Sequence, residues 1–468
     1  MSALVFERFL STPEIVAVFS ENAVVQAMMD FEAALARAQA AEGMIPAAAA
    51  QAIAGVCKAE LFDVPALVAA SGRCGSLAIP LVKKLTETVA LFDAAAAGYV
   101  HWGSTSQDVI DTAMVLQTRR ALALIDRDLS GLIGSLQSLA REHAGAPMLA
   151  RTLMQPAQVV SFDFKLVSWI APLVRAQQRL RDAGRAALQL QLGGAVGTLA
   201  VMGRHGAAVA RRMADALQLA LPPGAWHTQR DALASLACEV GVLTGTLGKI
   251  AKDISLLAQA EVGELAEASG GGRGGSSAMP HKRNPVASMI ALSAASRVPQ
   301  RVSALLSAMV QEHERGLSNW QAELAESAGL YIATHGAVKA LADAAGAIEV
   351  DAARMRSNID ALHGLVFAES IAMLFATRIG KAQAHALLER LSNESVNGQR
   401  HLRDVTLLEL SRDDALRSLF DASEVAALFE PEAAAQHASQ LARPQLDALS
   451  RQAQGLAESA PWALWLNG

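Results

Sequence analysis

Aromatic residues are scarce in this chain of 468 residues, which contains 12 Phe, 6 Trp and 2 Tyr, or 4% in all. Aromatic side chains are among those that favour β-strands, so the scarcity of aromatic residues disfavours an extensive sheet. Hydrophobic residues nevertheless make up 52% of the sequence, and alanine and leucine dominate. The composition therefore predicts an all-α protein, and the length is sufficient for two or three domains with sizeable cores.

Cysteine is also rare, and the charges are nearly balanced. The 3 cysteines, Cys57, Cys74 and Cys238, are too widely spaced for a disulfide framework or a zinc site. The sequence has no HExxH motif, no paired CxxC motifs and no carboxylates clustered at ligand spacing, so we expect no metal and no cofactor. A net charge of −5 argues against nucleic acid as a partner. A cationic site for an acidic substrate must therefore be built locally.

Membrane and secretory signals are missing from the sequence. No charge-free apolar run reaches the ~18 residues of a membrane-spanning helix. Glu7 and Arg8 come too early for the apolar part of a secretory signal. We therefore expect a cytoplasmic protein without a membrane partner.

The most informative segment is 270–285, with the sequence GGGRGGSSAMPHKRNP. Glycine fills 270–275 except at Arg273, and such a run cannot hold a helix or a packed strand. The hydroxyl, cation and amide donors that follow are Ser276, Ser277, Lys282, Arg283 and Asn284. A flexible linker does not have this composition, and a phosphate-binding P-loop is excluded because no Gly-Lys-Ser/Thr follows the glycines. The segment predicts a mobile loop that binds an anion.

Two heptad-like runs predict long helices. Apolar residues spaced alternately by three and four run from Leu233 to Leu257, and a second such run spans Leu122 to Leu139. Helices over about 108–143 and 228–268 would be about 50 and 60 Å long at ~1.5 Å per residue. Helices of this length favour a homo-oligomer that pools them in one core, although a bundle within one chain is the alternative. We expect an N-terminal domain at 1–108, a central long-helix bundle at 109–355 and a small helical C-terminal domain at 356–468.

The segment Gly103–Asp108, with the sequence GSTSQD, combines hydroxyls with a predicted helix start. Such hydroxyls cap a helix, and the free N–H groups of its first turn can bind a substrate carboxylate. His101, shortly before this turn, is a further candidate that hydrogen-bonds the substrate or a partner carboxylate, and a purely structural histidine is the alternative. Arg230 and Arg315 add cationic candidates from other segments, and for each of them an ordinary surface ion pair is the alternative.

Three segments together resemble the fumarase/aspartase superfamily, whose members form or break a bond β to a carboxylate. They are GSSAMPHKRNP near 275–285, HWGSTSQDVIDTA at 101–113 and GAVGTLA at 194–200. The resemblance implies a three-domain helical fold and a homotetramer with shared active sites. It also implies Ser277 as the proton-transfer residue, with Lys282 and His101 as further catalytic residues. The substrate-binding residues that it implies are Thr105, Ser106, Gln155, Arg230, Ser276, Met279, Asn284 and Arg315.

The segment RTLMQPA at 151–157 narrows the reaction. Superfamily lyases usually carry a histidine two residues after the arginine, where this chain has Leu153. A departing amine needs a proton, whereas a carboxylate with a pKa near ~4 is already ionised and attacks a double bond without a base. This favours lactonisation of an unsaturated polycarboxylate.

The chain most resembles the 3-carboxymuconate cycloisomerase branch of protocatechuate breakdown. The segments that carry this likeness are DFEAALARAQAAEG at 30–43, WHTQRD at 226–231, QEHER at 311–315 and IEVDAARMRSNID at 348–360. That branch typically has tryptophan at Leu153 and histidine at Pro156, and QPA is closer to adenylosuccinate lyases. The alternatives are an adenylosuccinate-type lyase that eliminates fumarate and a non-catalytic homologue of the same fold.

Overall fold

The computed structural model describes residues 5–268, 274–275, 279 and 281–459. The N-terminal elements are α1 (Val5–Arg8), α2 (Pro13–Val18), α3 (Glu21–Ala41), α4 (Ala47–Val56), η1 (Ala59–Leu61), α5 (Val64–Cys74), α6 (Ala78–Ala90) and η2 (Ala96–Tyr99). The central elements are α7 (Ser106–Glu142), β1 (Pro147–Thr152), β2 (Gln155–Ser161), α8 (Phe162–Ala187), η3 (Gly203–His205), α9 (Gly206–Leu217), α10 (Asp231–Leu257), β3 (Leu265–Ala266), α11 (Val286–Ser307), α12 (Asn319–Ala345) and β4 (Glu349–Val350). The C-terminal elements are α13 (Ala352–Asp360), η4 (Leu365–Phe367), α14 (Ala368–Ile379), α15 (Lys381–Gly398), α16 (Leu402–Arg412), α17 (Asp414–Leu419), α18 (Ala422–Ala427) and α19 (Pro431–Glu458).

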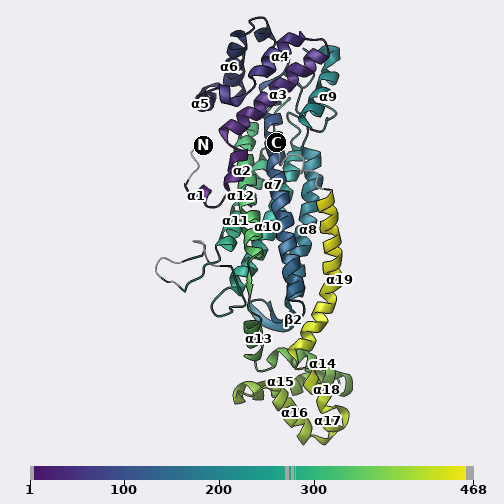
Figure 1. Ribbon diagram of the computed structural model, residues 1–468. Helices are drawn as coiled ribbons and strands as arrows, with labels where there is room; N and C mark the ends of the chain where they lie inside the picture. Colours follow the sequence, from purple (N-terminus) through teal and green to yellow (C-terminus); the bar gives the residue numbers. More distant parts are fainter. Residues whose placement is uncertain (1–4, 269–273, 276–278, 280, 460–468) are drawn as a thin grey trace.

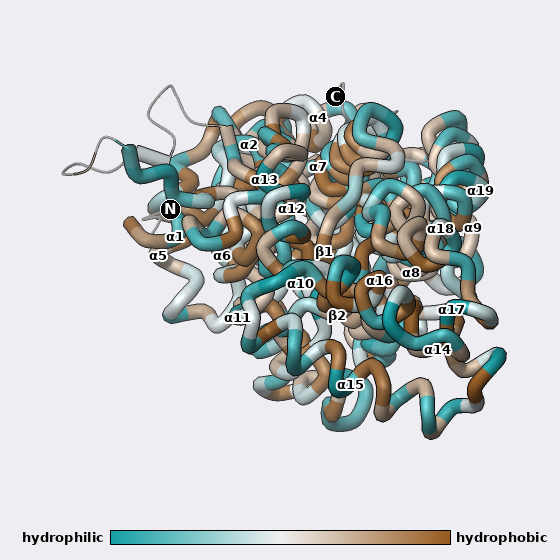
Figure 2. The backbone as a smooth tube through the Cα atoms, turned by 90° about the horizontal axis from the view of Figure 1, so that it is seen from below, coloured by the Kyte–Doolittle hydropathy of each residue, from teal (hydrophilic) through white to brown (hydrophobic). Residues whose placement is uncertain are grey.

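The molecule is elongated, and its long helices run along its length (Figure 1). Helices α3 to α6 lie at one end, α7, α8, α10, α11 and α12 form the middle, and α14 to α18 lie at the other end. Viewed from below, hydrophobic and hydrophilic stretches alternate along the helices, as expected when each helix buries one face (Figure 2). The prediction of an all-α fold with a central bundle of long helices is confirmed.

The heptad-like runs lie in the two central helices as predicted. Leu122, Leu129 and Leu136 on α7 are buried, as are Leu236, Leu243 and Leu247 on α10. The expected end of the second helix near residue 268 is wrong, because α10 ends at Leu257. After this helix the chain turns at Gly263, where φ is +63°, and enters the short ribbon of β3 and β4.

The buried hydrophobic residues form two clusters. The larger one is continuous from the N-terminal helices through the central bundle. The smaller one joins the C-terminal helices to the hairpin residues Leu149 and Val159. Helix α19 leaves the C-terminal helices and returns along α8, where Leu446 and Leu456 belong to the larger cluster. The division into three domains at 108 and 355 stays a prediction.

Strands β1 and β2 form an antiparallel hairpin just after α7. The two residues between them, Leu153 and Met154, both adopt left-handed backbone conformations, with φ of 49° and 67°. Two positive φ values match the turn type that fits the twist of a tight hairpin, although glycine and asparagine are the usual residues there. Leu153 is 97% exposed and Met154 69% exposed. The composition of the chain does not predict this hairpin.

Among the described residues, helix α10 has the length and the apolar composition of a membrane-spanning helix. Half of its most apolar stretch is buried inside the protein. It packs against α8, α11 and α12, as the core helix of a bundle does.

Candidate active site

The turn before α7 carries hydroxyls that face a guanidinium group. Thr105 is the N-cap residue of α7, and its side chain forms a capping box with Asp108. Arg315, in the loop between α11 and α12, donates to Thr105 Oγ1 over 2.7 Å and to Ser106 Oγ over 3.1 Å. It also donates to Gln107 Oε1 over 3.2 Å. The structure thus joins three residues of the predicted site, Thr105, Ser106 and Arg315.

His101 lies beside this turn, and its partner is a buried carboxylate on α3. The imidazole Nδ1 donates to Glu32 Oε1 over 2.6 Å, and the Glu32 side chain is fully buried. Burial alone would lower the pKa of His101, but Glu32 and, more weakly, Asp108 outweigh it and raise the pKa above its ordinary value. The buried carboxylate of Glu32 thus stabilises the protonated imidazole of His101 relative to the neutral one.

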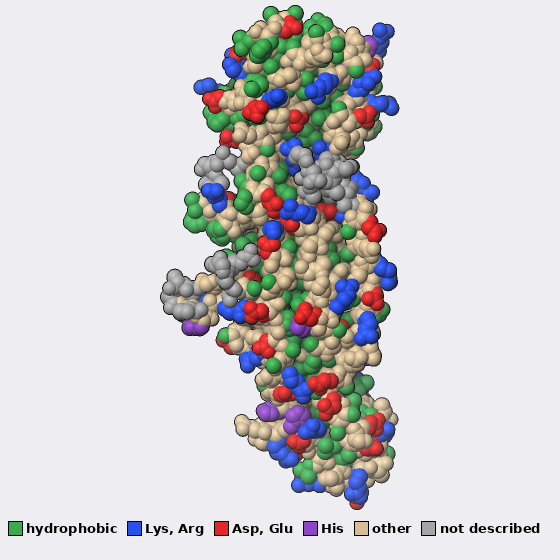
Figure 3. Space-filling view, in the orientation of Figure 1, with side chains coloured by type: hydrophobic (Ala, Val, Ile, Leu, Met, Phe, Trp, Pro, Cys, Tyr) green, Lys and Arg blue, Asp and Glu red, His purple; other side chains and the backbone are tan. Residues whose placement is uncertain are grey.

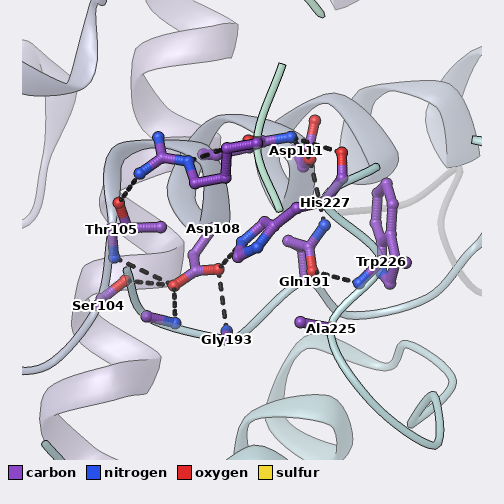
Figure 4. A network of polar contacts seen from close by, with 12 residues as sticks. Ser104, Thr105, Asp108, Asp111, Gln191, Gly193, Ala225, Trp226 and His227 are labelled. Carbon is purple, nitrogen blue, oxygen red and sulfur yellow. Dashed lines mark hydrogen bonds and ion pairs between the residues drawn. The ribbon is translucent and has the colours of Figure 1, made fainter. Parts of the chain in front are cut away.

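Beneath the turn lies a buried network that joins α7 to two other segments (Figure 4). Asp108 accepts hydrogen bonds from the backbone amides of Gly193 and Gly194, each over 2.9 Å. His227 Nε2 donates to Asp108 Oδ1 over 2.8 Å, since an ionised carboxylate can only accept. Gln191 accepts from the Trp226 amide over 2.9 Å. This network holds the first turn of α7 against the segments around Gly193 and His227, and we call it the buried floor of the candidate site.

Arg230 is part of the same buried region and lines a small cavity of about 30 Å³ together with Asp111 and Glu323. It donates to both oxygens of Asp111 on α7, over 2.9 and 3.1 Å, and to both oxygens of Glu323 on α12. Burial would lower the pKa of Arg230, but the two carboxylates raise it above its ordinary value. Every side-chain nitrogen of Arg230 is thus occupied by a partner that holds α7 and α12 together. This placement does not support the expected binding of a substrate anion by Arg230.

The loop between β3 and α11 holds a second group of predicted residues. Ser276 and Ser277 lie outside the described residues. Met279, Lys282 and Asn284 line an open groove of about 790 Å³ between the loop and the β3–β4 ribbon.

The segment 281–285, which we call the loop stem, is bonded to the β3–β4 ribbon and to Gly274 in the earlier part of the loop. The backbone N–H of Asn284 donates to the Gly274 carbonyl over 2.9 Å. Arg283 forms two hydrogen bonds with Glu349 on β4, over 2.8 and 2.7 Å, and this pair raises the pKa of Arg283 and lowers that of Glu349. The stem therefore holds Lys282 and Asn284 at the start of α11.

Gln155 lies on the hairpin and is exposed. Arg151, which pairs with Pro156 close to the tip of the hairpin, donates to both oxygens of the buried Glu264, over 3.0 and 2.6 Å. Asn358 on α13 donates to the same carboxylate over 2.8 Å. The hairpin is therefore anchored at Arg151, while the residues of the tip and Gln155 are exposed.

One chain does not bring these groups together. The turn lies at the start of α7 and the hairpin follows the end of this helix, whose 37 residues span about 55 Å. Asn284 precedes α11 and Arg315 follows it, so the 22 residues of this helix separate them by about 33 Å. The turn lies toward one end of the central bundle, whereas the hairpin and the loop stem between β3 and α11 lie toward the other (Figure 1). A substrate of a few carbon atoms cannot span these distances.

Comparison with known proteins identifies the family. A family model described as lyase matches residues 7–300. The chain belongs to this lyase family. A 3-carboxy-cis,cis-muconate cycloisomerase from Bradyrhizobium diazoefficiens is 48% identical, over 94% of this chain and 97% of that protein. A nitrosuccinate lyase from Streptomyces davaonensis is 40% identical, over 89% of this chain and 88% of that protein.

Solved structures agree with the family assignment. The crystal structure of 3-carboxy-cis,cis-muconate lactonizing enzyme from Pseudomonas putida matches with a TM-score of 0.89 and 41% identity, covering 97% of this chain and 99% of that one. A fumarate lyase from Mesorhizobium matches with a TM-score of 0.85 and 30% identity, covering 94% and 99%. The resemblance to the fumarase/aspartase superfamily is confirmed, and so is its cycloisomerase branch.

Within the described residues of this lyase-family chain, one group has the composition of a metal site. Glu14, Asp128 and His335 each offer a ligand atom, and these atoms lie within 4.8 Å of one another. Arg127 donates to both carboxylates, over 2.8 to 3.1 Å, and so supplies the positive charge that a cation would bring. Burial would raise the pKa of Asp128, but His335 and Arg127 lower it to about 2. The group is therefore an internal ion-pair network.

Sequence reasoning missed the buried carboxylates around the turn, which are Glu32, Asp111 and Glu323. Each pairs with a residue at least 69 positions away in the chain. A signal existed for Glu32, which stands between Phe31 and Ala33 on a stretch of α3 that is otherwise almost entirely apolar. A charge buried in such a stretch needs a partner, which indicates a polar site nearby.

Proposed function

We propose that this protein is a 3-carboxy-cis,cis-muconate cycloisomerase that closes its substrate to a carboxymuconolactone in aromatic degradation by the protocatechuate (β-ketoadipate) route. The observation that carries the proposal is the near full-length identity of 48% with a cycloisomerase of that name. The geometry of the hairpin supports it independently.

The hairpin tip bears on the type of reaction. Leu153 occupies the position at which superfamily lyases usually carry a histidine, and its side chain is 97% exposed. A leucine can neither donate nor accept a proton, so this position cannot protonate a departing amine. Addition of an internal carboxylate needs no such acid, because the nucleophile is already ionised. The tip is therefore suited to lactonisation.

Carboxylate addition leaves a carbanion that resonates into a doubly charged carboxylate. Fixed donors aimed at this charge are worth roughly 3–4 kcal/mol each. In our proposal Lys282 and Asn284 supply such donors, and Ser277 transfers the proton. Ser276 and Met279 contact the substrate from the same loop. Thr105, Ser106 and Arg315 bind a substrate carboxylate, His101 adds a positive charge, and Gln155 contacts the substrate from the hairpin.

We further propose a homotetramer in which different chains contribute the turn, the hairpin and the loop to one site. The separation of these segments along α7 and α11 supports this arrangement, because a single chain leaves each of them incomplete. The central region also exposes apolar side chains that contact with other chains would bury. Among them are Val242 on α10, which is 50% exposed, Met289 on α11, 47% exposed, and Leu317, 83% exposed. Figure 3 shows hydrophobic side chains along one face of the molecule, among charges of both signs.

A cytoplasmic location fits the same proposal. Cys57, Cys74 and Cys238 are all free thiols, as is usual in a reducing compartment.

The decisive experiment offers purified protein 3-carboxymuconate and adenylosuccinate in parallel and follows ultraviolet absorbance. We expect loss of the conjugated diene absorbance with the first substrate and no change with the second, and Ser277→Ala should abolish the first signal. Turnover of adenylosuccinate alone would favour the fumarate-eliminating lyase instead. No turnover of either substrate by a folded protein would favour a non-catalytic homologue.

A further inference from the structure

Two segments of the chain, 191–200 with the GAVGTLA motif and 226–231 with the WHTQRD motif, pack against the Thr105 turn and carry none of the proposed chemistry. They meet at one carboxylate, that of Asp108, which is fully buried. Besides the bonds from Gly193, Gly194 and His227, it accepts from the Thr105 amide over 3.0 Å and from Ser104 Oγ over 3.4 Å. One side chain thus connects the turn to both motifs (Figure 4).

The fit around this carboxylate has little tolerance. A Cβ atom on Gly193 would lie 2.5 Å from the Ala225 Cβ and 2.9 Å from His227 Cε1. Gly194 has a φ of +70°, and a Cβ there would lie 2.9 Å from the Gly103 carbonyl oxygen. Only glycine permits both close approaches, so both amides can reach Asp108. The backbone of 193–194 is therefore packed directly against the turn.

The Asp108 carboxylate divides its oxygens between the two sides of the network. Oδ2 accepts from the Thr105 amide and the Gly194 amide, while Oδ1 accepts from the Gly193 amide and the His227 imidazole. Two donors to Asp108 are side chains, Ser104 Oγ over 3.4 Å and His227 Nε2 over 2.8 Å. The His227 bond is the shorter of the two, and a substitution can remove it without altering the turn itself. His227 is itself fixed, because its carbonyl accepts from Gln107 Nε2 over 2.9 Å.

We propose that His227 is a positioning residue, which acts through Asp108 to hold the Thr105–Ser106 turn in the orientation that binds a substrate carboxylate. This inference rests on the proposed function of the turn. His227 touches neither the substrate nor the reacting atoms. Its imidazole fixes the rotation of the Asp108 carboxylate, the carboxylate fixes the Thr105 amide, and the amide fixes the direction of the hydroxyls toward Arg315. Misplacement of such hydroxyls by about 1 Å can cost up to ~100-fold in catalysis.

The test compares His227→Leu with His227→Gln, since only the second retains an N–H group near the position of Nε2. We expect His227→Leu to lower kcat/KM about 10- to 100-fold, mainly through KM, because the turn binds the substrate in ground state and transition state alike. His227→Gln should stay within about threefold of wild type. His385→Gln, in the exposed part of α15, is the matched control and should change nothing.

Thermal unfolding and calorimetric titration with tricarballylate, a saturated tricarboxylate, complete the test. Similar Tm values for the two His227 variants, with weaker tricarballylate binding only in His227→Leu, would support the positioning role. If His227→Leu does not fold, His227→Asn takes its place, because its shorter amide cannot reach Asp108.

Equal affinities in the two His227 variants, whether both retained or both reduced, would overturn the proposal. The titration does not depend on turnover, so the two failures are distinguishable. Failure of the proposed reaction removes wild-type turnover but leaves the difference in affinity, whereas failure of the positioning role leaves turnover and removes that difference.

Discussion

The two ends of α7 differ in how completely one chain builds them. At its start, Thr105 and Ser106 have Arg315 as a partner, and Asp108 and His227 form a buried floor. Beyond its end, the hairpin residues Leu153 and Gln155 project into solvent. The buried hydrogen bonds of this chain thus lie next to the turn at which we propose that a substrate carboxylate binds. In our proposal, other chains complete the groups around the reacting atoms.

The largest expected effect concerns the loop rather than the turn. Ser277→Ala should reduce kcat by ~10²–10⁴, because a positioned proton donor contributes that much. The Tm should stay within a few degrees of wild type. Steady-state kinetics and a thermal melt measure both. A variant that keeps more than about a tenth of wild-type kcat would remove Ser277 from the mechanism.

Mixing two inactive variants tests directly whether the turn and the loop come from different chains. Ser277→Ala chains and Thr105→Ala/Ser106→Ala chains, dissociated and reassembled together, should regain roughly a quarter of wild-type activity in a closed symmetric oligomer. Each site then draws its turn and its loop from two chains at random. Absence of recovery after subunit exchange, verified by native mass spectrometry, would mean that each site is built within one chain.

The turn itself is probed by Arg315→Lys. Lysine has one compact ammonium group and cannot donate to Thr105, Ser106 and Gln107 at once, so kcat/KM should fall about tenfold. The change should appear mainly in KM. Arg443→Lys, at an exposed position on α19, is the control for the loss of a guanidinium group. An unchanged KM for Arg315→Lys would show that the turn binds substrate without this arginine.

The smallest expected effect is the pH dependence of the Glu32–His101 pair. Because Glu32 raises the pKa of His101, the pair stabilises the fold fully below the unfolded pKa near ~6.5, and this contribution is lost as pH rises through the folded pKa. Glu32→Gln should therefore lower the free energy of unfolding by roughly 1–3 kcal/mol at pH 6, and by less at pH 9. Urea denaturation at the two pH values measures this difference. A loss that is larger at pH 9 would contradict the assignment.

The sequence predicted the long helices because their apolar residues repeat at a regular spacing, which depends only on near neighbours. It misplaced the end of α10, because neither a proline nor a charge run marks Leu257, where the helix ends. The hairpin tip could not be foreseen, since Leu153 and Met154 are not residues that favour positive φ.

The candidate site divides in the same way. Thr105 and Ser106 were predictable because a hydroxyl-rich turn precedes a long helix, and the structure places Arg315 against them. The placement of Arg230 was not predictable, because its two carboxylates lie 119 and 93 positions away in the chain. Sequence spacing identifies local chemistry, but pairing over such distances is decided by packing.

The exposed tip of the hairpin has an evolutionary consequence. Leu153 contributes almost nothing to the core of its own chain, so its replacement should cost little folding stability. Under the proposed function, a lineage can therefore exchange this side chain, and with it the protonation available to a leaving group, while the Arg151–Glu264 pair keeps the hairpin in place. A chain that is 40% identical to this one already carries the name of a different reaction, that of nitrosuccinate lyase.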